Sequence, residues 1–146
     1  MIRRYGEVPQ PGQRYQVRHG AYAVLHRNGQ VLLTWQDDPH YELQLPGGGI
    51  DPGEGAITAL HREVFEETGW RIGQPRRLGT FRRFTYMPEY DMWAEKVCHI
   101  FAARPIRRLG PPTEPEHTPV WTTPEVAVQH VYNDGDATFL RHAVLG

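Results

Sequence analysis

A dense acidic segment at residues 48–70, GGIDPGEGAITALHREVFEETGW, is the feature that most constrains this chain. Apolar Ile57, Leu60 and Val64 recur at helical spacing, which predicts an amphipathic helix over about residues 55–68. Gly69 follows as a natural left-handed C-terminal stop. The fold must therefore bury one face of this helix and leave the opposite, glutamate-rich face beside solvent or a ligand.

Three glutamates share the predicted helix: Glu63, Glu66 and Glu67. Like charges at i,i+3 and i,i+4 cost roughly 0.2–0.5 kcal/mol per pair, and the last helical turn favours cations over anions. A divalent cation would reverse these penalties, because hard cations such as Mg²⁺ prefer carboxylate oxygens. The alternative is a solvated acidic face that neighbouring basic side chains partly neutralise.

The same segment resembles the Nudix box, Gly-x5-Glu-x7-Arg-Glu-U-x-Glu-Glu-x-Gly-U, in which U is a bulky apolar residue. The matching positions are Gly48, Glu54, Arg62, Glu63, Val64, Glu66, Glu67, Gly69 and Trp70. Two departures are small. Gly55 stands where Ser or Thr often caps the helix, and Trp70 replaces the commoner Ile, Leu or Val. The resemblance identifies the chain as a member of the Nudix (MutT-like) hydrolase family.

The resemblance implies a role for each matching residue. The expected metal ligands, for Mg²⁺ with Mn²⁺ as a substitute, are Glu63, Glu66, Glu67 and Gly48. Arg62 is expected to orient the first of these glutamates. Glu54 supports the loop before the helix and is expected to assist the metal or the water. Gly48 and Gly49 allow the turn that brings the backbone close to metal and substrate.

The remaining patterns are typical of a sheet flanked by helices. Strands are predicted at 17–27, 30–36, 76–86 and 92–103, an Asn-Gly turn at 28–29, a turn-like loop over MPEYD, a Pro-rich loop at 105–119, and two C-terminal helices, the first beginning at 123–125. The resemblance implies an α+β fold, an α/β/α sandwich with a curved mixed β-sheet. We expect one domain over residues 1–146, with residues 1–14 as a loose N-terminal arm.

Composition excludes several classes of protein. The net charge of −1 provides no global attraction to nucleic acid or an anionic membrane. Cys98 is the only cysteine, which excludes an internal disulfide and a cysteine zinc site. The N-terminus has no apolar signal core, so we expect a cytoplasmic protein. A homodimer is a possibility that the resemblance suggests.

Candidates outside the box are less specific. In several Nudix enzymes a glutamate of a late loop supplies a ligand or the general base, and here Glu116 is favoured over Glu114 or a helix glutamate. The predicted substrate-binding residues are Arg18, Trp35, Gly48, Gly49 and Tyr86.

The expected activity is that of a metal-dependent pyrophosphohydrolase. Its substrate would be a nucleoside diphosphate linked to another moiety: a nucleoside triphosphate, a nucleotide sugar, ADP-ribose or a dinucleoside polyphosphate. One alternative is a nucleotide-sensing Nudix module without catalysis, which the complete set of box residues disfavours. Another is an RNA 5′-end pyrophosphohydrolase, which the near-neutral charge does not support.

Overall fold

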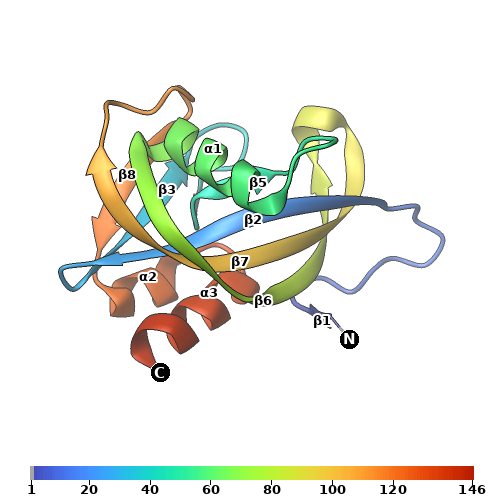
Figure 1. The fold of residues 1–146 in the computed structure, drawn as a ribbon. Helices are drawn as coiled ribbons and strands as arrows, with labels where there is room; N and C mark the ends of the chain where they lie inside the picture. The colour runs from blue at the N-terminus through green and yellow to red at the C-terminus, as the bar shows by residue number, and fades with distance from the viewer. Residues whose placement is uncertain (1) are drawn as a thin grey trace.

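A mixed β-sheet lies between one helix on one face and two on the other (Figure 1). The structure, a computed structural model, describes residues 2–146. Its strands are β1 (Arg3–Arg4), β2 (Gln16–Arg27), β3 (Gln30–Gln36), β4 (Glu42–Gln44), β5 (Gly47–Gly49), β6 (Trp70–Met87), β7 (Met92–Arg108) and β8 (His117–Thr122). Its helices are α1 (Ala56–Thr68), α2 (Pro124–His130) and α3 (Asp134–Leu140), with a 3₁₀ turn η1 (Pro88–Tyr90) and a π turn η2 (Arg141–Leu145).

The hydrogen-bonded strand order is β1-β6-β7-β2-β3-β4, with β5 also on β2 and β8 on β3. Strand β7 runs parallel to β2 and antiparallel to β6, so the sheet is mixed, as predicted. No helix formed by residues 2–146 combines the length and the apolar character that crossing a membrane requires.

The sheet has a hydrophobic core on each face. Successive side chains of a strand point to opposite faces, so Ala23 and Leu25 of β2 pack with Leu60 and Val64 of α1, whereas Val24 belongs to the core under α2 and α3. Two members of the repeat that predicted α1, Leu60 and Val64, therefore lie on its buried face, whereas the third, Ile57, is exposed.

Local signals placed α1 and the first hairpin correctly. Gly69 has a φ of 76° and its N–H donates to the Phe65 carbonyl, which ends α1 as predicted. Asn28 and Gly29 have φ values of 53° and 76°, the left-handed pair that a tight hairpin between β2 and β3 requires.

Two expectations were wrong in part. The Pro-rich segment is not all loop, because β7 continues to Arg108 and pairs there with Trp70, at the start of β6. The arm is not all loose either, since Arg3 and Arg4 pair with β6 and the ring of Tyr5 packs edge-on against Phe81. Residue 1 of the predicted arm lies outside the described residues.

Candidate active site

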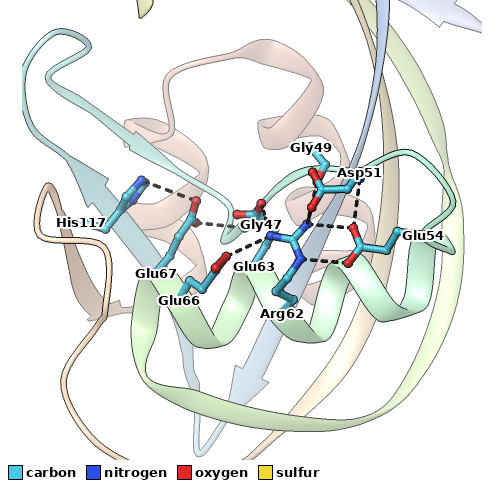
Figure 2. Close-up of polar contacts among 9 residues, drawn as sticks. All are labelled: Gly47, Gly49, Asp51, Glu54, Arg62, Glu63, Glu66, Glu67 and His117. Atoms are coloured by element: carbon cyan, nitrogen blue, oxygen red, sulfur yellow. Dashed lines mark hydrogen bonds and ion pairs between the residues drawn. The ribbon is translucent and has the colours of Figure 1, made fainter.

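Arg62 is the centre of a carboxylate cluster on α1 (Figure 2). Its Nε and Nη2 donate to the two carboxylate oxygens of Glu54, both at 2.8 Å. Nη1 donates to Glu63 at 2.9 Å and to Glu66 at 3.0 Å, and Nη2 also reaches the Gly49 carbonyl at 3.1 Å. One guanidinium thus ties the loop before the helix to two of the three helix glutamates.

The charges of this cluster shift one another's protonation. The hydrogen bonds from Arg62, with a backbone N–H from Asp51, lower the pKa of Glu54 to about 2. The hydrogen bond to Glu54 in turn raises the pKa of Arg62. Burial raises the pKa of Glu63, and the nearby carboxylates of Glu66 and Glu114 act in the same direction. Glu54 is therefore held as an anion. At Glu63 the hydrogen bond from Arg62 does not offset the effect of burial and of the nearby carboxylates on the pKa.

Glu67 points away from Arg62 toward a different set of partners (Figure 2). Its side chain is buried, accepts the Gly47 N–H at 3.1 Å and lies 3.5 Å from Nε2 of His117. The other ring nitrogen of His117 shares a buried 2.9 Å hydrogen bond with Thr34. Burial raises the pKa of Glu67 well above its usual range, and Glu63 and Glu114 contribute to the same shift.

The glycines of β5 make room for these carboxylates. A Cβ on Gly48 would lie 2.5 Å from a carboxylate oxygen of Glu63, so only glycine allows the backbone to approach this closely. A Cβ on Gly49 would meet nothing nearer than Arg18, at 3.6 Å. Gly48 is thus the position at which the predicted close approach is required.

The donor set suits a hard divalent cation, although its members do not already converge on one point. Within residues 2–146, no three His, Cys, Asp or Glu side chains form a ready-made cation site. The available donors are carboxylate oxygens, the ligands that Mg²⁺ and Mn²⁺ prefer. Burial and mutual proximity raise the pKa of Glu63 and of Glu67, and a bound cation would offset both causes.

The late loop, which joins β7 to β8 over residues 109–116, is hydrogen-bonded to the C-terminal end of α1. The Glu66 carbonyl accepts the N–H groups of Thr113 and Glu114 at 2.9 and 3.0 Å, satisfying a carbonyl that a helix end leaves free. Burial, followed by the charge of Glu116, raises the pKa of Glu114. The Glu116 carbonyl accepts from the Asp37 N–H at 2.9 Å. The carboxylate of Glu114 therefore acts electrostatically on Glu63 and Glu67, whereas Glu116 acts on Glu114.

A cleft of about 360 Å³ opens beside the cluster. Four of the five predicted substrate residues line it: Arg18, Gly48, Gly49 and Tyr86. The Tyr86 hydroxyl donates to Asp91. Trp35 does not line the cleft, and its indole N–H donates to Asp37 at 2.7 Å. Strand alternation explains the difference, because the neighbouring Gln36 faces the cleft instead.

Sequence reasoning missed several groups that line the cleft: Tyr22, Arg83, Lys96 and Asp136. His117, which the sequence suggests as an exposed loop residue that could assist the late glutamates, is buried and also lines the cleft. One signal was available, because Lys96 is the only lysine among 16 Lys and Arg residues and stands next to an apolar run, VCHIF. Burial raises the pKa of Asp136 to about 6 and lowers that of Lys96.

Comparison with known proteins identifies the family and the fold. The family model of the NUDIX domain matches residues 14–143. The structure resembles a NUDIX hydrolase from Nitrosomonas europaea, with a TM-score of 0.70, 18% identity, and coverage of 88% of this chain and 90% of that one. It also resembles a MutT protein from Bacillus halodurans, with a TM-score of 0.66, 21% identity, and coverage of 88% and 83%.

Curated relatives match over shorter stretches. A Bacillus subtilis protein named "Putative 8-oxo-dGTP diphosphatase" is 37% identical over 76 residues, which is 51% of this chain and 50% of that protein. An RNA pyrophosphohydrolase of Cronobacter sakazakii is 41% identical over 61 residues, 42% of this chain and 34% of that protein. The chain thus matches half or less of the length of these relatives. The family model, by contrast, spans nearly all of the chain, and with the Arg62 cluster at the position of the box the chain belongs to the Nudix family.

Proposed function

We propose that this protein is a metal-dependent pyrophosphohydrolase. Its substrate would be a nucleoside diphosphate linked to another moiety, cleaved at the diphosphate. The observation that carries the proposal is the carboxylate cluster around Arg62, which lies beside a cleft large enough for a small molecule. Carboxylate ligands for a hard cation beside a small-molecule cleft are a usual setting of metal-assisted hydrolysis.

In this proposal the three helix glutamates, Glu63, Glu66 and Glu67, hold Mg²⁺ or Mn²⁺, with backbone help at Gly48. When bound, the cation would neutralise charge on the diphosphate and promote ionisation of the attacking water. Arg62 is a positioning residue, because it holds Glu63 and Glu66 through one nitrogen. Glu54 fixes Arg62 in place through two hydrogen bonds.

The proton of the attacking water needs an acceptor within hydrogen-bond reach. Glu114 and Glu116 both lie on the late loop that is fastened to Glu66. We assign this role to Glu114, because its carboxyl acts on Glu63 and Glu67 and its own pKa is raised toward the working range of a base. Glu116, which the sequence favours, is the neighbour that contributes to raising that pKa.

The names of the relatives support anhydride cleavage but differ in substrate. One is named as a diphosphatase of an oxidised nucleoside triphosphate and another as an RNA pyrophosphohydrolase. A sensing module without catalysis is disfavoured, because every charged residue of the box is present and Arg62 contacts Glu54, Glu63 and Glu66. The cytoplasmic location and the homodimer stay predictions.

The test is a release assay for phosphate and pyrophosphate with Mg²⁺ and with Mn²⁺. The panel would hold nucleoside triphosphates (including oxidised ones), nucleotide sugars, ADP-ribose and dinucleoside polyphosphates. We expect turnover of at least one class, abolished by a chelator and reduced at least 100-fold in Glu67→Gln. Tight nucleotide binding without turnover of any member would instead support the sensing module.

A further inference from the structure

Three cations form a row across neighbouring strands at the floor of the cleft. Arg18 of β2 is the register partner of Lys96 of β7, and Lys96 is the register partner of Arg83 of β6. All three side chains line the same cleft. Adjacent strands lie about 4.8 Å apart, so the row spans roughly 10 Å.

The row lacks anionic partners within the protein. Among residues 2–146, no carboxylate oxygen lies within 4.0 Å of the charged nitrogens of Arg18, Lys96 or Arg83. Asp136 and Glu42 share the cleft but stay beyond that distance. Like charges directly opposite one another destabilise a sheet. The free protein therefore carries a charge arrangement that an anion would relieve.

Arg83 provides independent support for an anion-binding cleft. Its Nε is buried and has no hydrogen-bond partner, the one such side-chain atom found within residues 2–146. A buried donor without an acceptor costs roughly 1–3 kcal/mol. The adjacent Arg82 is different, since it donates to Glu95 at 3.2 Å and does not line the cleft. The unpaired state is thus particular to the side chain that faces the cleft.

Aromatic rings hold the two arginines at the ends of the row. The guanidinium of Arg18 lies 4.5 Å from the ring centre of Tyr90, and that of Arg83 lies 5.9 Å from the ring centre of Tyr132. These cation–π contacts position the charges without neutralising them. The arginines therefore keep their N–H donors available for a ligand.

One end of the row adjoins the proposed metal site. A Cβ built on Gly49 would lie 3.6 Å from Arg18, and one built on the preceding Gly48 would touch the Glu63 carboxylate. A chain of phosphates that leaves the cluster at Gly48 therefore meets Arg18 first, and then Lys96 and Arg83 across the strands.

We propose that the row of Arg18, Lys96 and Arg83 binds phosphate groups that extend beyond the metal-bound diphosphate. This inference rests on the proposed function and narrows its substrate. The substrate carries a chain of three or more phosphates, as in a nucleoside triphosphate or a dinucleoside polyphosphate. A nucleotide sugar or ADP-ribose fits less well, because the neutral sugar beyond its diphosphate leaves the three charges uncompensated.

The first test compares long and short phosphate chains as substrates. We expect kcat/KM to be higher for a nucleoside triphosphate than for the matching diphosphate or for ADP-ribose. Lys96→Met and Arg83→Met should each lower the value for the triphosphate by roughly 10- to 100-fold, the worth of a hydrogen bond to a charged group, and should reduce the preference for the longer chain. Arg82→Met is the matched control and should keep the wild-type preference for the longer chain. Equal losses on long and short chains would overturn the proposal.

The second test needs no hydrolysis. Inorganic tripolyphosphate with a chelator should raise the thermal unfolding temperature of the wild type and of Arg82→Met, but not that of the Lys96→Met, Arg83→Met double variant. An equal rise in the double variant would refute the row as the binding site. If tripolyphosphate protects while no substrate is turned over, the proposed activity fails and the phosphate site stands.

A chain of three phosphates also occurs at the 5′ end of RNA. A parallel assay with 5′-triphosphorylated oligoribonucleotide and free nucleoside triphosphate separates the two carriers. The cleft of about 360 Å³ has the size of a small-molecule site, which favours the free nucleotide. The carrier with the higher kcat/KM is the preferred one, and in both cases that value must fall in Arg83→Met for the proposal to hold.

Discussion

Arg62 holds Glu54 by both carboxylate oxygens, each at 2.8 Å. The same guanidinium reaches Glu63 and Glu66 through its remaining nitrogen. Only a planar fork with several fixed donors can serve three carboxylates at once. The contact therefore sets the direction of two proposed metal ligands from a residue that would not itself touch the metal.

Arg62→Lys should preserve the charge but lose this geometry. We expect kcat/KM to fall 10- to 100-fold, the usual cost of removing a partner that orients metal ligands. The Mg²⁺ concentration for half-maximal activity should rise, which a Mg²⁺ titration of the rate measures. Wild-type metal dependence in Arg62→Lys would contradict this positioning role.

Gly48→Ala should impair the site through a single methyl group. The new Cβ would lie 2.5 Å from a Glu63 carboxylate oxygen and displace it, so we expect at least a 10-fold loss of kcat. Gly49→Ala is the matched control, because its Cβ meets only Arg18, at 3.6 Å, an ordinary contact. If both alanine variants lose the same activity, the clash with Glu63 is not the cause.

Glu114→Gln should lower kcat more than Glu116→Gln. Removing a general base costs about 10²- to 10⁴-fold, and Glu114 is the late carboxylate that acts on both Glu63 and Glu67. Single-turnover rates at saturating Mg²⁺ measure the chemical step. A larger loss in Glu116→Gln would return the role to the residue that the sequence favours.

Asp136 should make the protein less stable as the pH rises. Burial raises its pKa from an ordinary 3.8 to about 6, so the folded state binds the proton more tightly than the unfolded chain. The stabilisation is complete below pH 3.8 and is lost as the pH rises through about 6, a change of about 3 kcal/mol at most.

Urea unfolding between pH 4 and 7 tests this dependence. Asp136→Asn should flatten the fall in the free energy of unfolding, because its amide does not titrate. Asp134→Asn, an exposed change at the start of the same helix, serves as the control. An unchanged slope in Asp136→Asn would assign the dependence to other groups.

Local patterns made part of the molecule predictable from sequence. The apolar repeat of Leu60 and Val64 and the stop at Gly69 lie within a few helical turns of one another. They predict a helix over about residues 55–68, and α1 spans Ala56–Thr68 in the structure. The family and its sandwich fold could be predicted for the same reason, because the box lies on one continuous segment.

The row of cations could not be predicted in this way. Arg18, Arg83 and Lys96 come from three strands, and they share a face only because of the register between those strands. Strand β6 has register shifts between Gly73 and Arg76 and between Arg77 and Gly79. A slip of one residue sends every later side chain to the opposite face. Trp35 was misplaced for a related reason, since the next residue along β3 faces the cleft.

The Glu66 carbonyl, which accepts two N–H groups from the late loop, has a consequence for how occupancy can be observed. The main-chain amides of Thr113 and Glu114 are protected from solvent exchange only while the loop stays fastened to α1. A ligand that steadies the glutamate side chains should therefore slow deuterium uptake at these two amides. Exchange at these two loop amides would therefore report whether a metal or a substrate is bound beside α1.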